Sequence, residues 1–144
     1  MHKFLLLSLL LLTSCTSTPD PVFHTSHEPK KADAPFSDAV TAGPFLLLSG
    51  QIGMDHSTRT LVPGGIQEQT HRTIRNIEEV LDQHGRGLDD VVRCTVILST
   101  IEDFAAFNEV YVQYFPHKPA RTTFAASGLA RNALIEIEVT AMAQ

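Results

Sequence analysis

The stretch Lys118-Pro-Ala-Arg-Thr-Thr-Phe124, followed by Ala133-Leu-Ile-Glu-Ile-Glu-Val-Thr-Ala141, decides the fold. Both runs have the apolar–polar alternation of half-buried strands, and the Gly-containing segment 127–132 separates them. One face of the second run is apolar and the other is polar; the apolar face holds Ile135, Ile137, Val139 and Ala141. This pattern predicts two strands, of which the second buries one face.

The polar residues of this stretch carry opposite charges. Glu136 and Glu138 lie on the polar face of the second strand, and Arg121 opens the first. A cation and a carboxylate on such strands can meet across a sheet or across a subunit interface. Because the planar fork of arginine grips a carboxylate at two points, the arrangement suits a small substrate that carries a carboxylate. An ordinary cross-strand salt bridge explains the same residues, and the stretch alone leaves both interpretations open.

Length and charge limit the classes of protein to consider. The 144 residues predict one domain, and 43% hydrophobic residues are enough for a core. The net charge of −5 and the absence of a basic cluster in the sequence argue against a nucleic-acid partner.

The N-terminus has the features of a targeting signal. His2-Lys3 precede an apolar run that is far shorter than the ~20 residues needed to cross a bilayer. The run ends in Leu12-Thr-Ser-Cys15, which resembles the bacterial lipobox, whose Cys is lipidated and becomes the mature N-terminus. Thr16 follows where Asp would favour inner-membrane retention, so we expect a lipoprotein of the outer membrane that faces the periplasm. A secretory signal with a coincidental Cys is the alternative.

The remaining cysteine and the next segment fit this interpretation. If Cys15 carries lipid, Cys94 has no intrachain partner, and its apolar surroundings predict that it packs as a small hydrophobe. Residues 16–33 are rich in Pro, Thr, Ser and charge, which predicts a disordered tether with a reach of about 20–25 Å. His24 and His27 are spaced as metal ligands can be, but no Cys or acid ligands accompany them, so no metal site is predicted. The predicted parts are a signal peptide with its lipobox Cys at 1–15, the tether at 16–33 and the folded domain at 34–144.

The hydrophobic periodicity and the positions of Gly and Pro predict the order β-β-α-β-α-β-β. The strands are expected at 36–41, 45–49, 92–98, from about 120, and at 133–141, and the first helix at 66–84, with Gly85 as its stop. Ser99-Thr-Ile-Glu102 has the capping-box spacing and predicts the start of the second helix. The fold class is therefore α+β, with both helices on one sheet face. Because the other face stays uncovered in a monomer, we expect assembly.

The second helix carries an aromatic stripe at helical spacing. Its members are Phe104, Phe107, Tyr111 and Tyr114, and such a stripe predicts core packing. Asn108 lies beside the stripe, where it is either a surface residue or a residue that faces a cleft.

Several motifs, taken in order from about residue 34 to the C-terminus, resemble the RidA (YjgF-like) family of enamine/imine deaminases. They are Pro35-Phe-Ser37, Ser49-Gly-Gln-Ile52, Thr73-Ile-Arg-Asn-Ile77, Asp103-Phe-Ala-Ala-Phe-Asn-Glu-Val-Tyr111, Pro119-Ala-Arg-Thr-Thr123 and Ala133-Leu-Ile-Glu-Ile-Glu138.

The resemblance implies a chorismate-mutase-like fold and a homotrimer with three clefts at its subunit interfaces. It also implies hydrolysis of reactive 2-enamino or 2-imino acids to 2-keto acids and ammonia, as in 2-iminobutanoate/2-iminopropanoate deaminases, with no cofactor or metal. By the motifs, Arg121 binds the substrate carboxylate and Glu136 positions the attacking water. The cleft is lined by Asn108, Ser49, Gly50, Phe36 and the backbone near Thr123.

Two positions depart from the pattern of the family. Phe36 stands where Tyr is usual, and Leu129-Ala-Arg-Asn132 replaces a Leu-Pro loop. Arg131 is expected to be a solvated loop residue, with competition for an acidic ligand as the alternative.

Two further hypotheses compete with the deaminase. One is a non-catalytic trimer that binds small carboxylates or partner proteins in the cell envelope. The other is a chaperone-like protein with no small-molecule site, in which Arg121 and Glu136 have no reason to coexist.

Overall fold

The computed structural model describes residues 19–143 of the chain. The lipobox with Cys15 and the rest of the predicted signal peptide lie outside the described residues. Within 19–143, no helix is long and apolar enough to cross a membrane.

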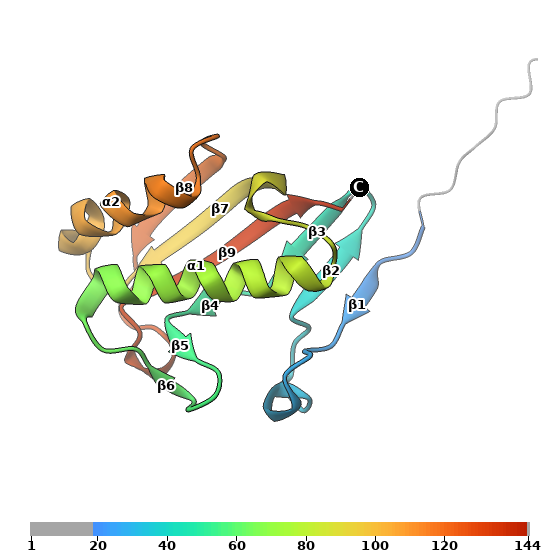
Figure 1. Ribbon diagram of the computed structural model, residues 1–144, viewed down its shortest axis with the longest axis horizontal. Coiled ribbons are helices and arrows are strands. Elements are labelled where there is room, and N and C mark those ends of the chain that lie inside the picture. Colours follow the sequence, from blue (N-terminus) through green and yellow to red (C-terminus); the bar gives the residue numbers. More distant parts are fainter. Residues whose placement is uncertain (1–18, 144) are drawn as a thin grey trace, which may run out of the picture.

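A single mixed sheet and two helices make up the body of the molecule (Figure 1). The strands are β1 (Val22–His24), β2 (Ala39–Ala42), β3 (Phe45–Leu48), β4 (Gln51–Ile52), β7 (Val91–Leu98), β8 (Ala120–Ala125) and β9 (Ile135–Met142), and a small hairpin consists of β5 (Met54–Asp55) and β6 (Thr60–Leu61). The helices are α1 (Gly65–Gln83) and α2 (Phe104–Tyr114). Both helices lie on one side of the sheet, which confirms the predicted α+β architecture (Figure 1).

The sheet has the order β1-β2-β3-β9-β7-β8, with β4 also paired to β9. Among the strand pairs in residues 19–143, only β7 and β8 run parallel, because the chain between them crosses over through α2. The expected apolar face of β9 is buried, so Ile135, Ile137 and Val139 form the centre of the core.

The first helix agrees with its prediction within a residue at each end. Ile74, Ile77 and Leu81 are fully buried against the sheet, as their spacing predicts. The helix ends before Gly85, whose φ of 64° is the left-handed conformation that glycine adopts without strain.

The segment before residue 34 differs from the predicted disordered tether. Val22–His24 form β1, which pairs antiparallel with β2, and a 3-10 turn follows at Pro29–Lys31. Lys31 Nζ lies 3.0 Å from Glu28 Oε1, and His56 Nδ1 lies 2.8 Å from the same oxygen. Backbone pairing with a sheet edge and shared charges hold this segment, so its low apolar content does not leave it disordered.

Two predicted boundaries are wrong for local reasons. A 3-10 turn at Ile101–Asp103 precedes α2, and neither Thr100 nor Asp103 makes a side-chain cap, so the capping-box prediction fails. Phe36 lies in a bend before β2 and its side chain is 55% exposed, because the strand begins only at Ala39.

The sheet face away from the helices carries exposed apolar side chains. Phe45 and Leu47 of β3 and Phe124 of β8 are between 41% and 45% exposed. Their positions alternate with the buried Leu46 and Leu48 on β3, which places them on the uncovered side. This face has the apolar character that the sequence predicted for an assembly surface.

Candidate active site

Within one copy of the chain, Arg121 and Glu136 lie on opposite faces of the sheet. Strand β7 separates β8 from β9, so the two residues are not on adjacent strands. Arg121 is in register with Cys94, which is buried under the helices, whereas Glu136 is in register with Ile97 and shares the uncovered face. The cross-strand salt bridge is therefore wrong, and only contact across two copies could bring these groups together.

Arg121 is held by α2. Its guanidinium carbon lies 4.5 Å from the centre of the Tyr111 ring and 5.3 Å from that of Phe107, and Nη1 donates a hydrogen bond to Asn108 Oδ1 over 2.9 Å. Phe107 and Tyr111 of the aromatic stripe are buried in the core, as predicted, whereas Phe104 is 38% exposed. The rings of the stripe also form a platform for the cation. Asn108 faces this site rather than bulk solvent.

The surroundings of Arg121 form a small cavity of about 350 Å³, lined also by Lys118 and Pro119. Among the residues described, no ion pair includes Arg121, so its other donors have no acid partner. Beside it, burial raises the pKa of the Cys94 thiol. A neutral buried thiol supports the prediction that Cys94 packs as a hydrophobe and does not attack substrate.

Thr123 lies two residues further along β8 and is half-buried. By strand alternation it shares the face of Arg121, and its Oγ1 is buried without a hydrogen-bond partner within residues 19–143. The structure thus brings Arg121 and Asn108 together, whereas Thr123 shares the face of Arg121 but is not among the residues that line its cavity.

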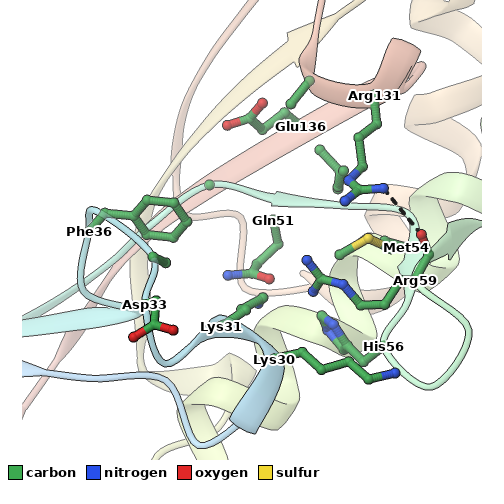
Figure 2. Close-up of a pocket in the computed structure, with 14 residues that line it drawn as sticks. Lys30, Lys31, Asp33, Phe36, Gln51, Met54, His56, Arg59, Arg131 and Glu136 are labelled. Carbon is green, nitrogen blue, oxygen red and sulfur yellow. Dashed lines mark hydrogen bonds between the residues drawn. The ribbon is translucent and has the colours of Figure 1, made fainter.

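Glu136 opens into a different cavity of about 460 Å³, which Figure 2 shows from one side. Gly50 and Gln51 from β4 and the segment before it line the cavity, together with Phe36. Burial, and secondarily the charge of Glu138, raises the pKa of the Glu136 carboxyl above its ordinary range. No cation pairs with this carboxylate in the described part of the chain.

Gly50 permits the position of the Glu136 carboxylate. A Cβ placed on Gly50 would overlap Oε1 of Glu136 and lie 2.9 Å from its Cδ. Ser49, by contrast, faces away from substrate chemistry, because its hydroxyl donates to the Ser37 carbonyl over 2.6 Å. Ser49 therefore holds the Phe36 segment against β4, whereas Gly50 and Phe36 line the cavity as expected.

Sequence reasoning missed three cations of this cavity and gave a role at an acidic ligand to Arg131 only as an alternative. Lys30, Lys31, Arg59 and Arg131 all line it, although they come from three separate segments of the sequence (Figure 2). No motif marks them, and only the packing of the N-terminal segment, the β5–β6 hairpin and the 130–132 turn gathers them. Arg131 is exposed, as predicted, but it also lines the cavity that contains Glu136.

Helix α1 supports the floor of the cavity through a buried amide. Asn76 is 1% exposed, and its Nδ2 donates to the carbonyls of Ile52 and Met54 over 2.9 and 3.0 Å. The Asn lies within one of the motifs of the resemblance, but its periodicity alone gives no sign of this role.

The chain is similar to known proteins both in sequence and in fold. The sequence matches the family described as endoribonuclease L-PSP over residues 25–143. The chain belongs to this family. The match covers most of the described residues and includes part of the segment that the sequence had placed in a tether.

Relatives within the endoribonuclease L-PSP family support the resemblance to RidA. A RutC family protein of Pyrococcus horikoshii is 43% identical over 83% of this chain and 95% of its own length. The 2-iminobutanoate/2-iminopropanoate deaminase of Homo sapiens is 40% identical over 77% of this chain and 82% of its own. A Yersinia pestis protein described as belonging to the conserved Rid family has a solved structure that is similar, with a TM-score of 0.79, 34% identity and coverage of 85% and 99%.

Proposed function

We propose that the protein hydrolyses 2-enamino and 2-imino acids to 2-keto acids and ammonia, at sites formed between two copies of a homotrimer. In each site Arg121 of one copy binds the substrate carboxylate and Glu136 of the next positions water. No cofactor or metal takes part in this scheme. The observation that carries the proposal is a pair of complementary half-sites: within residues 19–143, the Arg121 guanidinium has no acid partner and the Glu136 carboxylate has no cation partner.

The chemistry needs orientation more than a strong nucleophile. An imine carbon beside a carboxylate is already electrophilic, so a fixed substrate and a fixed water supply much of the rate. Glu136 takes a proton as the water oxygen bonds to the imine carbon and gives a carbinolamine. Glu136 returns its proton to the nitrogen, and the carbon–nitrogen bond breaks as the hydroxyl oxygen forms the keto carbonyl and releases its own proton to solvent. Ammonia and the keto acid are the products.

The environment of each residue suits its role. The rings of α2 and the Asn108 oxygen fix the guanidinium before substrate arrives, which lowers the entropy lost on binding. The raised pKa of Glu136 brings a carboxylate closer to the pH range in which a general base works best. Phe36 has no hydroxyl where the family usually has Tyr, so this part of the cavity wall is apolar.

Deaminase names among the relatives favour this activity over RNA hydrolysis, which the family description suggests. The net charge of −5 also disfavours binding of the negatively charged phosphate backbone of RNA. The non-catalytic carboxylate-binding protein remains the second candidate, since a guanidinium without an acid partner serves binding as well as catalysis.

A subunit-mixing experiment tests the proposal. An amino-acid oxidase generates imines in the assay, and keto-acid formation is followed with Arg121→Ala, with Glu136→Gln and with the two variants refolded together. Each variant alone is expected to be inactive. In random co-assembly about a quarter of the sites receive an intact Arg121 and an intact Glu136, so about a quarter of wild-type activity returns.

The control is the same two variants mixed after folding, without exchange of subunits. Activity in either single variant equal to wild type would remove the catalytic role of that residue, and no turnover above background by the wild type itself would leave the binding protein. Inactive variants that fail to complement after co-assembly would show that the two residues do not share a site between copies.

A further inference from the structure

The cavity that contains Glu136 has a concentration of positive charge that hydrolysis of a small imine does not explain. Lys30, Arg59 and Arg131 line it, and Figure 2 shows the Arg59 and Arg131 side chains on the same side, opposite Phe36. Its volume of about 460 Å³ falls in the range, roughly 300–1,000 Å³, of pockets that hold ligands larger than a three-carbon acid.

Apart from Glu136, which lines the same cavity and forms no ion pair within residues 19–143, these cations have little acid to balance them. Glu28 is shared among three groups, with its Oε1 3.0 Å from Lys31 Nζ and 2.8 Å from His56 Nδ1, and its Oε2 3.7 Å from Arg59 Nη1. Its single charge therefore leaves Arg59 only weakly paired. At the rim, Asp33 is exposed and takes part in no ion pair of residues 19–143.

Lys30 and Arg131 have only carbonyl partners. Lys30 Nζ donates to the Ser57 carbonyl over 3.4 Å, and Arg131 Nη1 donates to the Arg59 carbonyl over 3.3 Å. Neither belongs to an ion pair among the described residues. The bond from Arg131 also brings its positive guanidinium beside the backbone of another arginine, an arrangement that a bound anion stabilises.

We propose that Arg59 and Arg131, with Lys30 at the edge, bind a second anionic group of the substrate, so that the preferred substrates are 2-imino dicarboxylic acids. This inference rests on the proposed function for the position of the reacting carbon beside Glu136. Arg121 of the neighbouring copy binds the first carboxylate, and the carboxylate at the end of the side chain reaches the cation cluster. Paired arginines bind a carboxylate through two-point contacts, which suits this group.

The test compares an imino acid with a neutral aliphatic side chain and one with a carboxylate side chain, each generated by an oxidase. Wild type is expected to have the higher kcat/KM for the dicarboxylate. In Arg131→Gln the ratio of dicarboxylate to neutral kcat/KM falls roughly tenfold, because one charge-assisted contact is lost. Arg75→Gln, on the exposed surface of α1 and outside this cavity, is the matched control and keeps the wild-type ratio.

A binding arm separates this inference from the proposed function. Titration calorimetry with 2-oxobutanoate and with 2-oxoglutarate measures charge preference without turnover. Turnover of imines with no preference for the dicarboxylate, or an unchanged ratio in Arg131→Gln, overturns the inference and leaves the deaminase. No turnover of any imine, together with selective binding of 2-oxoglutarate that Arg131→Gln weakens, supports the anion site and rejects the deaminase.

If a short single-stranded RNA displaces 2-oxoglutarate at lower concentration than either keto acid does, the cluster binds nucleic acid and the inference is wrong.

Discussion

Gly50 determines where the Glu136 carboxylate can lie. In Gly50→Ala the new methyl group would occupy the place of Oε1, so the carboxylate has to turn away from its present position. The Glu side chain is flexible at its end, and we expect the fold to tolerate the change. Turnover of imines should nevertheless fall by roughly a hundredfold, because a small displacement of a catalytic group has such an effect.

Gly87→Ala is the matched control for this change. A Cβ on Gly87 meets no atom within 4 Å, and the residue has an extended backbone that alanine adopts freely. Steady-state kinetics and thermal denaturation of both variants check the prediction. A Gly50→Ala protein with wild-type kcat and KM would show that the carboxylate position seen here does not matter for the reaction.

The sequence alone predicts the roles of some site residues and not those of others. Arg121 and Glu136 stand in conspicuous motifs, so their importance was predicted, but their placement on opposite sheet faces was not. That placement follows from the pairing of β7 with both β8 and β9. The alternation of residues along one strand does not predict which strands pair or in which register. Arg59 was not predicted, and Arg131 was predicted to be solvated, with competition for an acidic ligand as the alternative, because only tertiary contacts bring these two loops together at one cavity.

At the scale of elements, β1 shows why a segment of low hydrophobicity can still be ordered. Val22 and Phe23 are exposed, so this strand gains little from burial. Its backbone pairs with β2, and His24 at its end bonds Thr41 Oγ1 over 2.9 Å and packs its ring 4.5 Å from that of His84. Edge pairing and histidine contacts leave no periodic signal in the sequence, whereas the long helix α1 does.

These contacts predict that acid loosens the N-terminal segment. Burial lowers the pKa of His84, with a smaller contribution from the charge of His24, and burial also lowers the pKa of His56. A histidine with a lowered pKa binds fewer protons in the folded state than in the unfolded state. Its contribution to stability is therefore present above the ordinary pKa of 6.5 and is lost as the pH falls below that value.

Urea denaturation at about pH 7.5 and about pH 5.5 measures this effect, and the midpoint should be lower in acid. In His84→Gln the ring contact with His24 is lost, and the difference between the two midpoints should shrink. Equal midpoints in the wild-type protein, or a larger difference in the variant, would contradict the assignment to this histidine pair.

For the whole molecule, the uncovered sheet face explains why one copy is an incomplete enzyme in the proposed scheme. Phe45, Leu47 and Phe124 offer apolar surface on the same side as Glu136, so association through this face would bury them and enclose the carboxylate. Arg121 lies on the helix side near the β8 edge, where a neighbouring copy can reach it. Fold and half-sites thus favour the same assembly that the motifs implied.

The position of β1 also bears on the proposed lipid anchor at Cys15. Because β1 begins at Val22, only residues 16–21 connect Cys15 to the sheet, and the seven Cα–Cα steps from Cys15 to Val22 span at most about 25 Å when fully extended. An anchored domain would then remain within that distance of the lipid headgroups, with the β1 edge of its sheet nearest to them. The longer tether predicted from the sequence, residues 16–33, would allow a greater maximum distance between the domain and the lipid headgroups.

If Cys15 is lipidated, as the lipobox predicts, Cys15→Ser moves the protein from the membrane fraction to the soluble fraction, because lipidation of that thiol is the step that attaches the protein. Fractionation of cell envelopes with an alkaline wash, followed by immunoblotting, measures the distribution. Cys94→Ala is the matched control, since Cys94 is fully buried and alanine fills most of its place without adding a polar group to the core. It should stay with the membrane, and a Cys15→Ser protein that also stays there would mean that something other than a lipidated Cys15 holds the domain at the envelope.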